Sequence, residues 1–68
     1  MDMEQLTRVE LRIAQLVALG QQDKQIASDI GVSYDAARQR LHILSQKIGA
    51  PNRAAVAAWY VRRTEVRS

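Results

Sequence analysis

Cysteine is absent from this chain of 68 residues, and histidine occurs only once. Disulfide bonds and thiolate metal sites are therefore excluded, and a lone histidine gives no metal-ligand cluster. Long apolar runs are also missing, since no stretch approaches the roughly 18 apolar residues of a membrane span. The first residues, MDMEQ, lack the basic and apolar regions of a signal peptide. These absences predict a cytoplasmic chain with no membrane segment and no metal.

Catalytic patterns are missing as well. The sequence has no phosphate-binding glycine loop, no Ser/His/Asp arrangement and no paired-carboxylate spacing, and its acidic residues are scattered. We therefore expect neither an enzyme nor a protein that binds a cofactor or a small-molecule ligand. The length predicts a single domain over residues 1–68. A chain of this size buries only about 60 % of its unfolded surface, so pairing with a second copy would stabilise it.

Charge is distributed unevenly, although the net charge is only +3. Residues 1–33 sum to −2, whereas residues 34–68 sum to +5. A basic half of this kind suits a polyanion, and nucleic acid is the commonest polyanion that a small cytoplasmic domain meets. A solvated basic surface that serves solubility is the alternative that charge alone leaves open.

Helical spacing and capping signals predict an all-α chain of four helices. Thr7 and Glu10 have the spacing of a capping box, and apolar residues, Val9 among them, then recur at helical intervals. A glycine follows each of the first three segments, and Asn52 can cap a fourth. The predicted helices cover about residues 7–19, 23–30, 34–48 and 53–63.

The segment 31–48 carries the clearest functional pattern. Gly31 suits a tight turn, and Ser33 can cap the helix that follows it. Apolar side chains predict one buried stripe on this helix, formed by Tyr34, Ala37, Leu41, Leu44 and Ile48. The adjoining arc is entirely polar and consists of Asp35, Arg38, Gln39, His42, Ser45 and Gln46. Two helices joined by a short glycine turn, the second with an exposed polar face, make a helix-turn-helix unit.

A longer set of residues has a specific spacing over nearly the whole chain. Its members are Leu6-Thr7, Glu10, Leu16-Val17-Ala18, Gly20, Lys24, Ile26-Ala27, Ile30-Gly31-Val32-Ser33, Arg38, Leu41, Lys47-Ile48-Gly49 and Asn52-Arg53. This set resembles the C-terminal DNA-binding domain of LuxR-type (GerE-like) transcriptional regulators. The resemblance implies a four-helix fold in which the third helix enters the major groove of DNA and the fourth helix forms a dimer.

The chain departs from the family's common pattern at three places. Arg8 and Val9 stand where the family commonly has proline and arginine, and Arg40 stands where it has histidine. Ala36 and Ala37 replace threonine and valine. Because Ala36 lacks a hydroxyl that could touch phosphate or backbone, we expect this chain to bind differently or more weakly.

Four residues of the polar arc are predicted to read bases. The planar fork of Arg38 suits the O6 and N7 acceptors of guanine, and Gln39 can make paired hydrogen bonds to adenine. His42 can reach a base or a phosphate, and a merely solvated side chain is its plain alternative. Asp35 can accept from cytosine N4 or simply favour the start of the helix. The first three match positions at which the family contacts bases.

A further set of side chains is predicted to contact the DNA backbone and consists of Lys24, Ser33, Tyr34, Arg40, Lys47 and Arg53. Two of them have another role open to them. Ser33 is placed to cap the third helix, and Arg53 can instead tie down the connection between the last two helices.

The last predicted helix, AAVAAWYV between arginines, is apolar on nearly every side. One buried stripe uses only part of such a surface, so we expect the rest to meet a second copy across a two-fold axis. The predicted interface consists of Ala54, Ala55, Ala58, Trp59 and Arg62, with core packing as the alternative for Trp59. Two third helices would then reach successive major grooves about 34 Å apart, on a palindromic operator.

These patterns together predict a dimeric, sequence-specific DNA-binding transcriptional regulator. The short segment before the first predicted helix cannot hold a sensory domain, so we expect none in this chain. The chain is then either a minimal regulator or a DNA-binding fragment of a longer one. The alternative is a module similar to the promoter-reading region of sigma factors, which would act on RNA polymerase or on another regulator.

Overall fold

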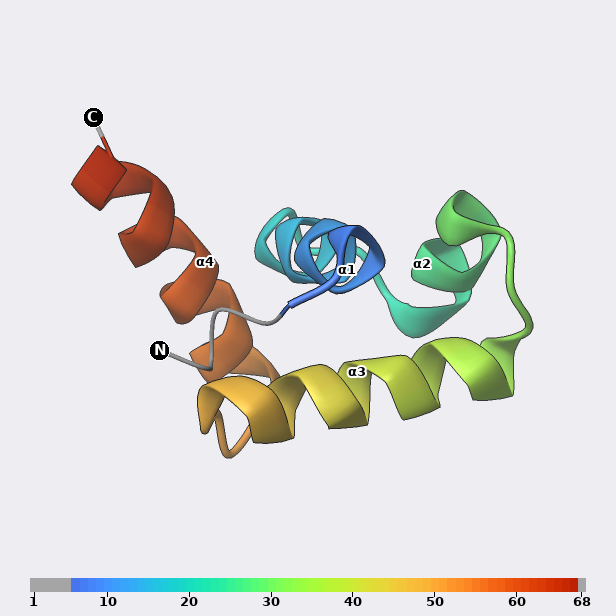
Figure 1. Cartoon of the computed structure of the whole chain (residues 1–68). Helices are drawn as coiled ribbons and strands as arrows, with labels where there is room; N and C mark the ends of the chain where they lie inside the picture. The colour runs from blue at the N-terminus through green and yellow to red at the C-terminus, as the bar shows by residue number, and fades with distance from the viewer. Residues whose placement is uncertain (1–5, 68) are drawn as a thin grey trace.

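The computed structural model describes residues 6–67, and this range contains helices but no strand. The helices are α1 (Arg8–Ala18), α2 (Asp23–Ile30), α3 (Tyr34–Ile48) and α4 (Arg53–Arg67). In Figure 1, α3 runs beneath α1 and α2, and α4 lies beside α1. The all-α class and the order of the elements agree with the sequence prediction.

A reciprocal pair of hydrogen bonds starts α1. The backbone N–H of Glu10 donates to the hydroxyl of Thr7 at 3.0 Å, and the N–H of Thr7 donates to the Glu10 carboxylate at 2.9 Å. These bonds satisfy donors that the first helical turn leaves without partners, which confirms the predicted capping box. Thr7 and Leu19 are the caps of α1. The helix is therefore one residue shorter at each end than predicted.

The start of α4 agrees with the sequence prediction, but its end does not. The side chain of Asn52 accepts from the N–H of Ala55 at 2.9 Å, which confirms the expected cap. The predicted end at residue 63 was wrong, because α4 continues to Arg67. No glycine or proline follows residue 63 to stop the helix. The hydroxyl of Thr64 donates to the carbonyl of Val61 at 2.9 Å, a bond that a helix accommodates.

The centre of the core is α1, which contacts all three other helices. Buried apolar side chains from every helix meet there, namely Ile13, Ala14, Leu16, Val17, Ile26, Leu44 and Val56. Two residues of the apolar patterns lie outside it, since Val9 is 39 % exposed and Tyr34 is 49 % exposed. Both belong to the first turn of their helix, where neighbouring helices do not cover them. The prediction that Tyr34 belongs to the buried stripe was therefore wrong.

Candidate nucleic-acid interface

The connection between α2 and α3 sets the position of α3. Gly31 ends α2 with φ +73°, a left-handed conformation that a side chain would strain. The N–H of Val32 donates back to the carbonyl of Ala27 at 3.0 Å, which closes the turn. Ser33 then accepts from the N–H of Ala36 at 3.1 Å and caps α3. The predicted turn and cap are confirmed, and they produce a helix-turn-helix arrangement.

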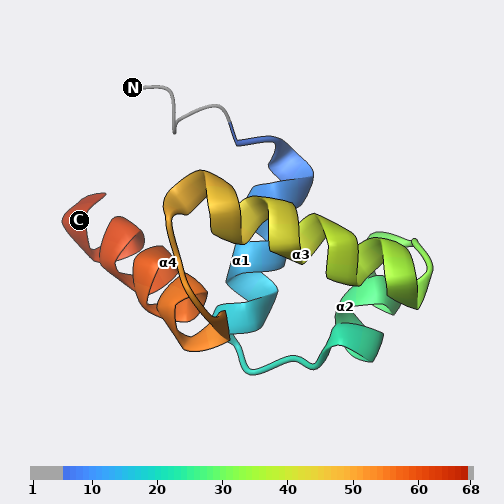
Figure 2. The same cartoon turned by 90° about the horizontal axis from the view of Figure 1, so that it is seen from below.

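One side of α3 is buried and the other is open. Ala37 and Leu44 are buried, while Leu41 and Ile48 are half-buried and pack against the core. The polar arc lies on the outside, where Asp35, Arg38, Gln39, His42 and Gln46 are exposed and Ser45 is half-buried. Figure 2 shows α3 crossing in front of α1 and α2, with this outer side uncovered. All four residues predicted to read bases are therefore accessible.

Arg38 is the most prominent charge of this arc. Its side chain is 63 % exposed, and its guanidinium lies 5.9 Å from the ring centroid of Tyr34. Its Nε is 4.0 Å from the Oδ2 atom of Asp23, which belongs to α2. A contact between an exposed arginine and a carboxylate at this distance is weak, so the guanidinium can still form other hydrogen bonds.

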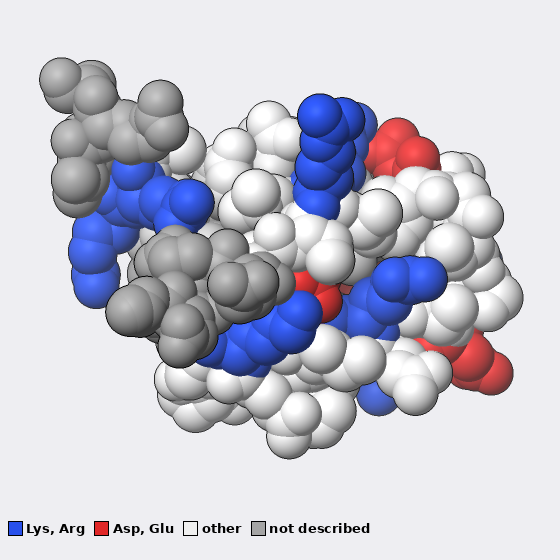
Figure 3. Space-filling model, viewed as in Figure 1, with Lys and Arg blue, Asp and Glu red and all other residues white. Residues whose placement is uncertain are grey.

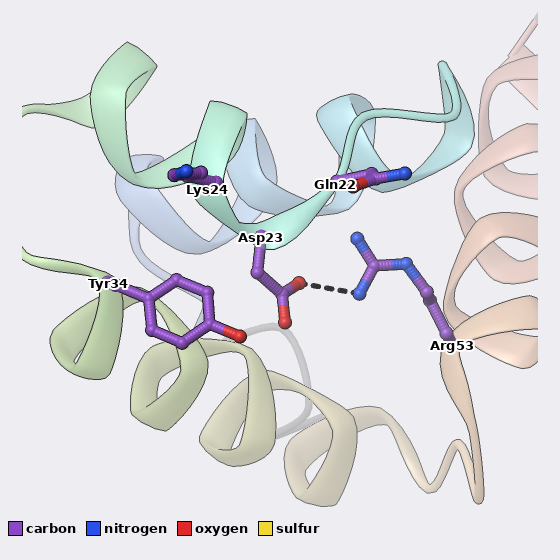
Figure 4. Close-up of a pocket in the computed structure, with 5 residues that line it drawn as sticks. All are labelled: Gln22, Asp23, Lys24, Tyr34 and Arg53. Carbon is purple, nitrogen blue, oxygen red and sulfur yellow. Dashed lines mark hydrogen bonds and ion pairs between the residues drawn. The ribbon is translucent and has the colours of Figure 1, made fainter.

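Asp23 has a second and closer arginine partner. The Nη1 atom of Arg53 donates to its Oδ1 at 2.6 Å, and the Nη2 atom of Arg53 donates to the carbonyl of Gln21 at 2.6 Å. Figure 4 shows Arg53 reaching the carboxylate from one side, with the ring of Tyr34 on the other. Arg53 thus ties the start of α4 to the start of α2. This is the alternative role that the sequence left open for it.

Lys47, which was also predicted to contact the DNA backbone, pairs with a buried carboxylate. Its Nζ lies 3.0 Å from both oxygens of Glu10, whose side chain is only 9 % exposed. Burial raises the pKa of Glu10, but hydrogen bonds from the Thr7 backbone and from Lys47, with the charge of Lys47, outweigh it. The pKa of Glu10 is lowered as a result. Lys47 therefore joins the end of α3 to α1.

The other four residues predicted to contact the DNA backbone are open to solvent. Lys24, Ser33, Tyr34 and Arg40 are exposed. Lys24 and Tyr34 line an open hollow between the starts of α2 and α3, together with Gln22, Asp23 and Arg53. Residues from the starts of α2, α3 and α4 thus meet at this hollow.

The outer side of α4 holds the predicted dimer residues. Ala54, Ala58 and Arg62 are exposed and follow one another at intervals of one helical turn. Ala55 and Trp59 are half-buried, and Trp59 packs against the core. The guanidinium of Arg63 lies 5.3 Å from the Trp59 ring. The face is therefore a row of two alanines and Arg62 beside one partly covered aromatic ring.

Two carboxylates form ion pairs that the sequence patterns do not predict. Asp23 stands at the start of the predicted helix 23–30, where a carboxylate is favourable, and Glu10 belongs to a capping box. Each carboxylate thus has a local role, and no pattern in the sequence indicates that Asp23 contacts an arginine 30 positions away or that Glu10 contacts a lysine 37 positions away. Opposite charge was the only feature of the sequence that could indicate these two ion pairs, and many other pairs of residues in the chain also have opposite charges.

Charged side chains are distributed unevenly over one face of the molecule. In Figure 3, lysines and arginines gather over α4 and recur across the centre, while most acidic side chains lie toward α2 and the start of α3. Within residues 6–67, no three His, Cys, Asp or Glu side chains gather into a possible metal site. No helix of this range is long and apolar enough to cross a membrane.

Comparison with protein families gives one clear match. The model of bacterial regulatory proteins of the luxR family matches residues 4–60, which covers all of α1, α2 and α3 and the first half of α4. Comparison with curated proteins and comparison with solved structures gave no significant match.

Proposed function

This chain belongs to the luxR family of bacterial regulatory proteins, and on that premise we propose that it reads a palindromic operator as a dimer through α3. Family membership makes it a DNA-binding helix-turn-helix transcription regulator. The dimer, the operator symmetry and the roles of single residues are the proposal. The open polar arc of α3, with Arg38 63 % exposed at its centre, is the observation that carries it.

The base-reading roles are assigned by side-chain chemistry. Arg38 donates to O6 and N7 of guanine, and Gln39 makes paired hydrogen bonds to adenine. His42 lies one turn beyond Arg38 and reaches the next base or its phosphate. Asp35, in the first turn, accepts from cytosine N4. All four side chains are exposed, so none has to leave the core to reach a base.

The backbone contacts fall into two groups. Lys24, Ser33, Tyr34 and Arg40 flank α3 and are exposed, which supports contacts with the phosphates on either side of the major groove. Lys47 and Arg53 already form ion pairs within the protein. These two share their charge between a carboxylate and the DNA, so their contribution to affinity is smaller.

The dimer is supported by the outer side of α4. Ala54, Ala58 and Arg62 lie on one exposed row, and Val61 next to it is 46 % exposed. Small side chains allow two helices to approach closely across a two-fold axis. With α4 at the axis, the two copies of α3 would lie about 34 Å apart and contact half-sites roughly 10 bp apart.

Selection of bound fragments from random DNA tests the proposal, followed by binding measurements on the selected site. The selected sequences should contain two inverted half-sites with centres roughly 10 bp apart. Arg38→Ala should cost about 1 to 3 kcal/mol of binding free energy at that site and relax the preference at one position. Arg12→Ala is a matched control, because Arg12 pairs with Asp29 between α1 and α2 and lies off α3.

Three results would contradict parts of this proposal. If Arg38→Ala and Arg12→Ala bind the selected site equally well, Arg38 does not read a base. If the selected sequences contain single half-sites, and the chain sediments as a monomer on them, the dimer is wrong. If no sequence is enriched but the chain binds RNA polymerase, the sigma-like alternative replaces the operator-binding function.

A further inference from the structure

Asp23 is the one described carboxylate that contacts two arginines assigned to DNA. Its Oδ1 accepts from Arg53 at 2.6 Å, and its Oδ2 lies 4.0 Å from the Nε atom of Arg38. The side chain is 24 % exposed, so water and ions can reach it. One negative charge is thus shared between the proposed base-reading arginine and a proposed backbone contact.

The surroundings of Asp23 place it at the edge of the DNA-facing surface. It lines the open hollow that contains Lys24, Tyr34 and Arg53. It also lines a second hollow beside the middle of α3, together with Arg38 and His42. Both hollows are rich in groups that attract phosphate, and the carboxylate lies between them. A phosphate that enters either hollow meets a like charge and must compete with Asp23 for the arginines.

This competition affects the two binding modes of such a protein unequally. Binding to DNA of arbitrary sequence depends almost entirely on neutralised phosphates. Binding to the correct site depends in addition on a base-reading side chain held in the right direction. A carboxylate that withholds positive charge weakens both modes. If the carboxylate also holds Arg38 in position, it recovers part of the lost affinity, but only at the correct site, where Arg38 reads a base.

We propose that Asp23 determines specificity by competing with DNA phosphate for Arg53 and by positioning Arg38 along the outer side of α3. Asp23 lowers the affinity for DNA of any sequence and raises the ratio of operator binding to non-specific binding. The inference rests on the proposed function, because it needs Arg38 to read a base. Asp23 itself touches no base and acts through the two arginines.

Asp23→Asn tests the inference, because it removes the charge and keeps the shape of the side chain. Affinities are measured for the selected operator and for a scrambled duplex over a series of salt concentrations, together with the thermal unfolding midpoint. The variant should bind the scrambled duplex several-fold more tightly. The slope of log K against log salt should steepen by up to about 1 per protomer, since Arg53 gains a phosphate. The ratio of operator to scrambled affinity should fall by about three-fold or more.

Asp29→Asn is the matched control. It changes the net charge by the same amount, but Asp29 pairs with Arg12 of α1 at 3.3 Å rather than with Arg38 or Arg53. It should leave the salt slope and the affinity ratio close to those of the parent chain. In the double variant Asp23→Asn/Arg53→Gln, the salt slope should return to the parent value, because the freed positive charge is gone.

The outcomes separate three explanations. If Asp23→Asn behaves like Asp29→Asn, or if it lowers the unfolding midpoint and both affinities in parallel, Asp23 only ties the helices together and the inference is wrong. If the double variant keeps the steeper slope, Arg53 is not the competing group and the inference is again wrong. If the parent chain shows no sequence preference, or Arg38→Ala has no effect, the proposed function fails and this inference fails with it.

Discussion

The two ends of α3 are attached to the rest of the molecule in different ways. Near its C-terminus, Lys47 lies 3.0 Å from both oxygens of Glu10, a carboxylate that is 9 % exposed. In its first half, Arg38 is 63 % exposed and lies 4.0 Å from Asp23. Both contacts join oppositely charged groups of different helices, but only in the first is the carboxylate shielded from water, while the Lys47 side chain itself is 36 % exposed.

This difference in burial decides what each ion pair can do. A buried charge that loses its partner is costly, because water cannot replace the lost contact. An exposed pair contributes little to stability, since water and salt compete with it, and for the same reason its partners exchange easily. The end of α3 is therefore fixed to the fold, while the Arg38 side chain in its first half stays open to solvent.

Lys47→Met should give the largest effect among changes that test this comparison. The aliphatic part of the side chain is kept, but Glu10 loses the charge that compensates its burial. We expect a loss of about 1 to 3 kcal/mol in the free energy of unfolding, measured by urea denaturation. Arg38→Met is the matched change at the open pair and should cost between about 0 and 1 kcal/mol. Equal losses in the two variants would show that burial does not separate the two pairs.

Acid should weaken the ion pair between Glu10 and Lys47. The pKa of Glu10 is lowered in the folded state from its ordinary value of 4.5. Its carboxylate therefore contributes stability above about pH 4.5, and this contribution is lost as the pH falls through the lowered value. In Glu10→Gln, the free energy of unfolding should change less between pH 6 and pH 3 than in the parent chain. Parallel pH curves for the two proteins would contradict a role of Glu10 in acid sensitivity.

Alanine substitution of the glycine before α3 and of the glycine after it should lower stability by the same amount. The two ends of α3 differ in their side-chain ion pairs, but their glycines have the same backbone conformation. Gly31 and Gly49 have φ values of +73° and +72°, and a Cβ added at either would meet no atom within 4 Å. Gly31→Ala and Gly49→Ala should each cost about 1 kcal/mol through backbone strain alone. Thermal unfolding measures both. A clearly larger cost at Gly31 would mean that the turn before α3 is under an additional constraint.

Sequence reasoning succeeded where the physical cause is local. The capping box of Thr7 and Glu10, the Ser33 cap and the Asn52 cap each involve residues three positions apart, and all three form as predicted. The polar arc of α3 was also predictable, because helical periodicity alone decides which side chains share a face. The exposure of Arg38 and His42 follows from that periodicity once the apolar stripe packs on the core.

The errors concern exposure at the ends of helices. Tyr34 fits the apolar spacing of α3, yet its ring lies at the hollow beside Asp23. Periodicity gives the direction of a side chain around the helix axis but not whether a neighbouring helix extends far enough to cover it. The same limit explains why the exposure of Val9 and the full length of α4 did not follow from the pattern.

The sequence by itself determined the helices, the turn before α3 and the polar arc, because caps, glycine turns and helical periodicity act between residues at most a few positions apart. Only the tertiary structure decided that Lys47 meets Glu10 and that Asp23 lies between Arg38 and Arg53. Those contacts depend on how α1, α2 and α4 pack against α3. Packing brings together charges that are far apart in the chain, and it determines which of them water can still reach.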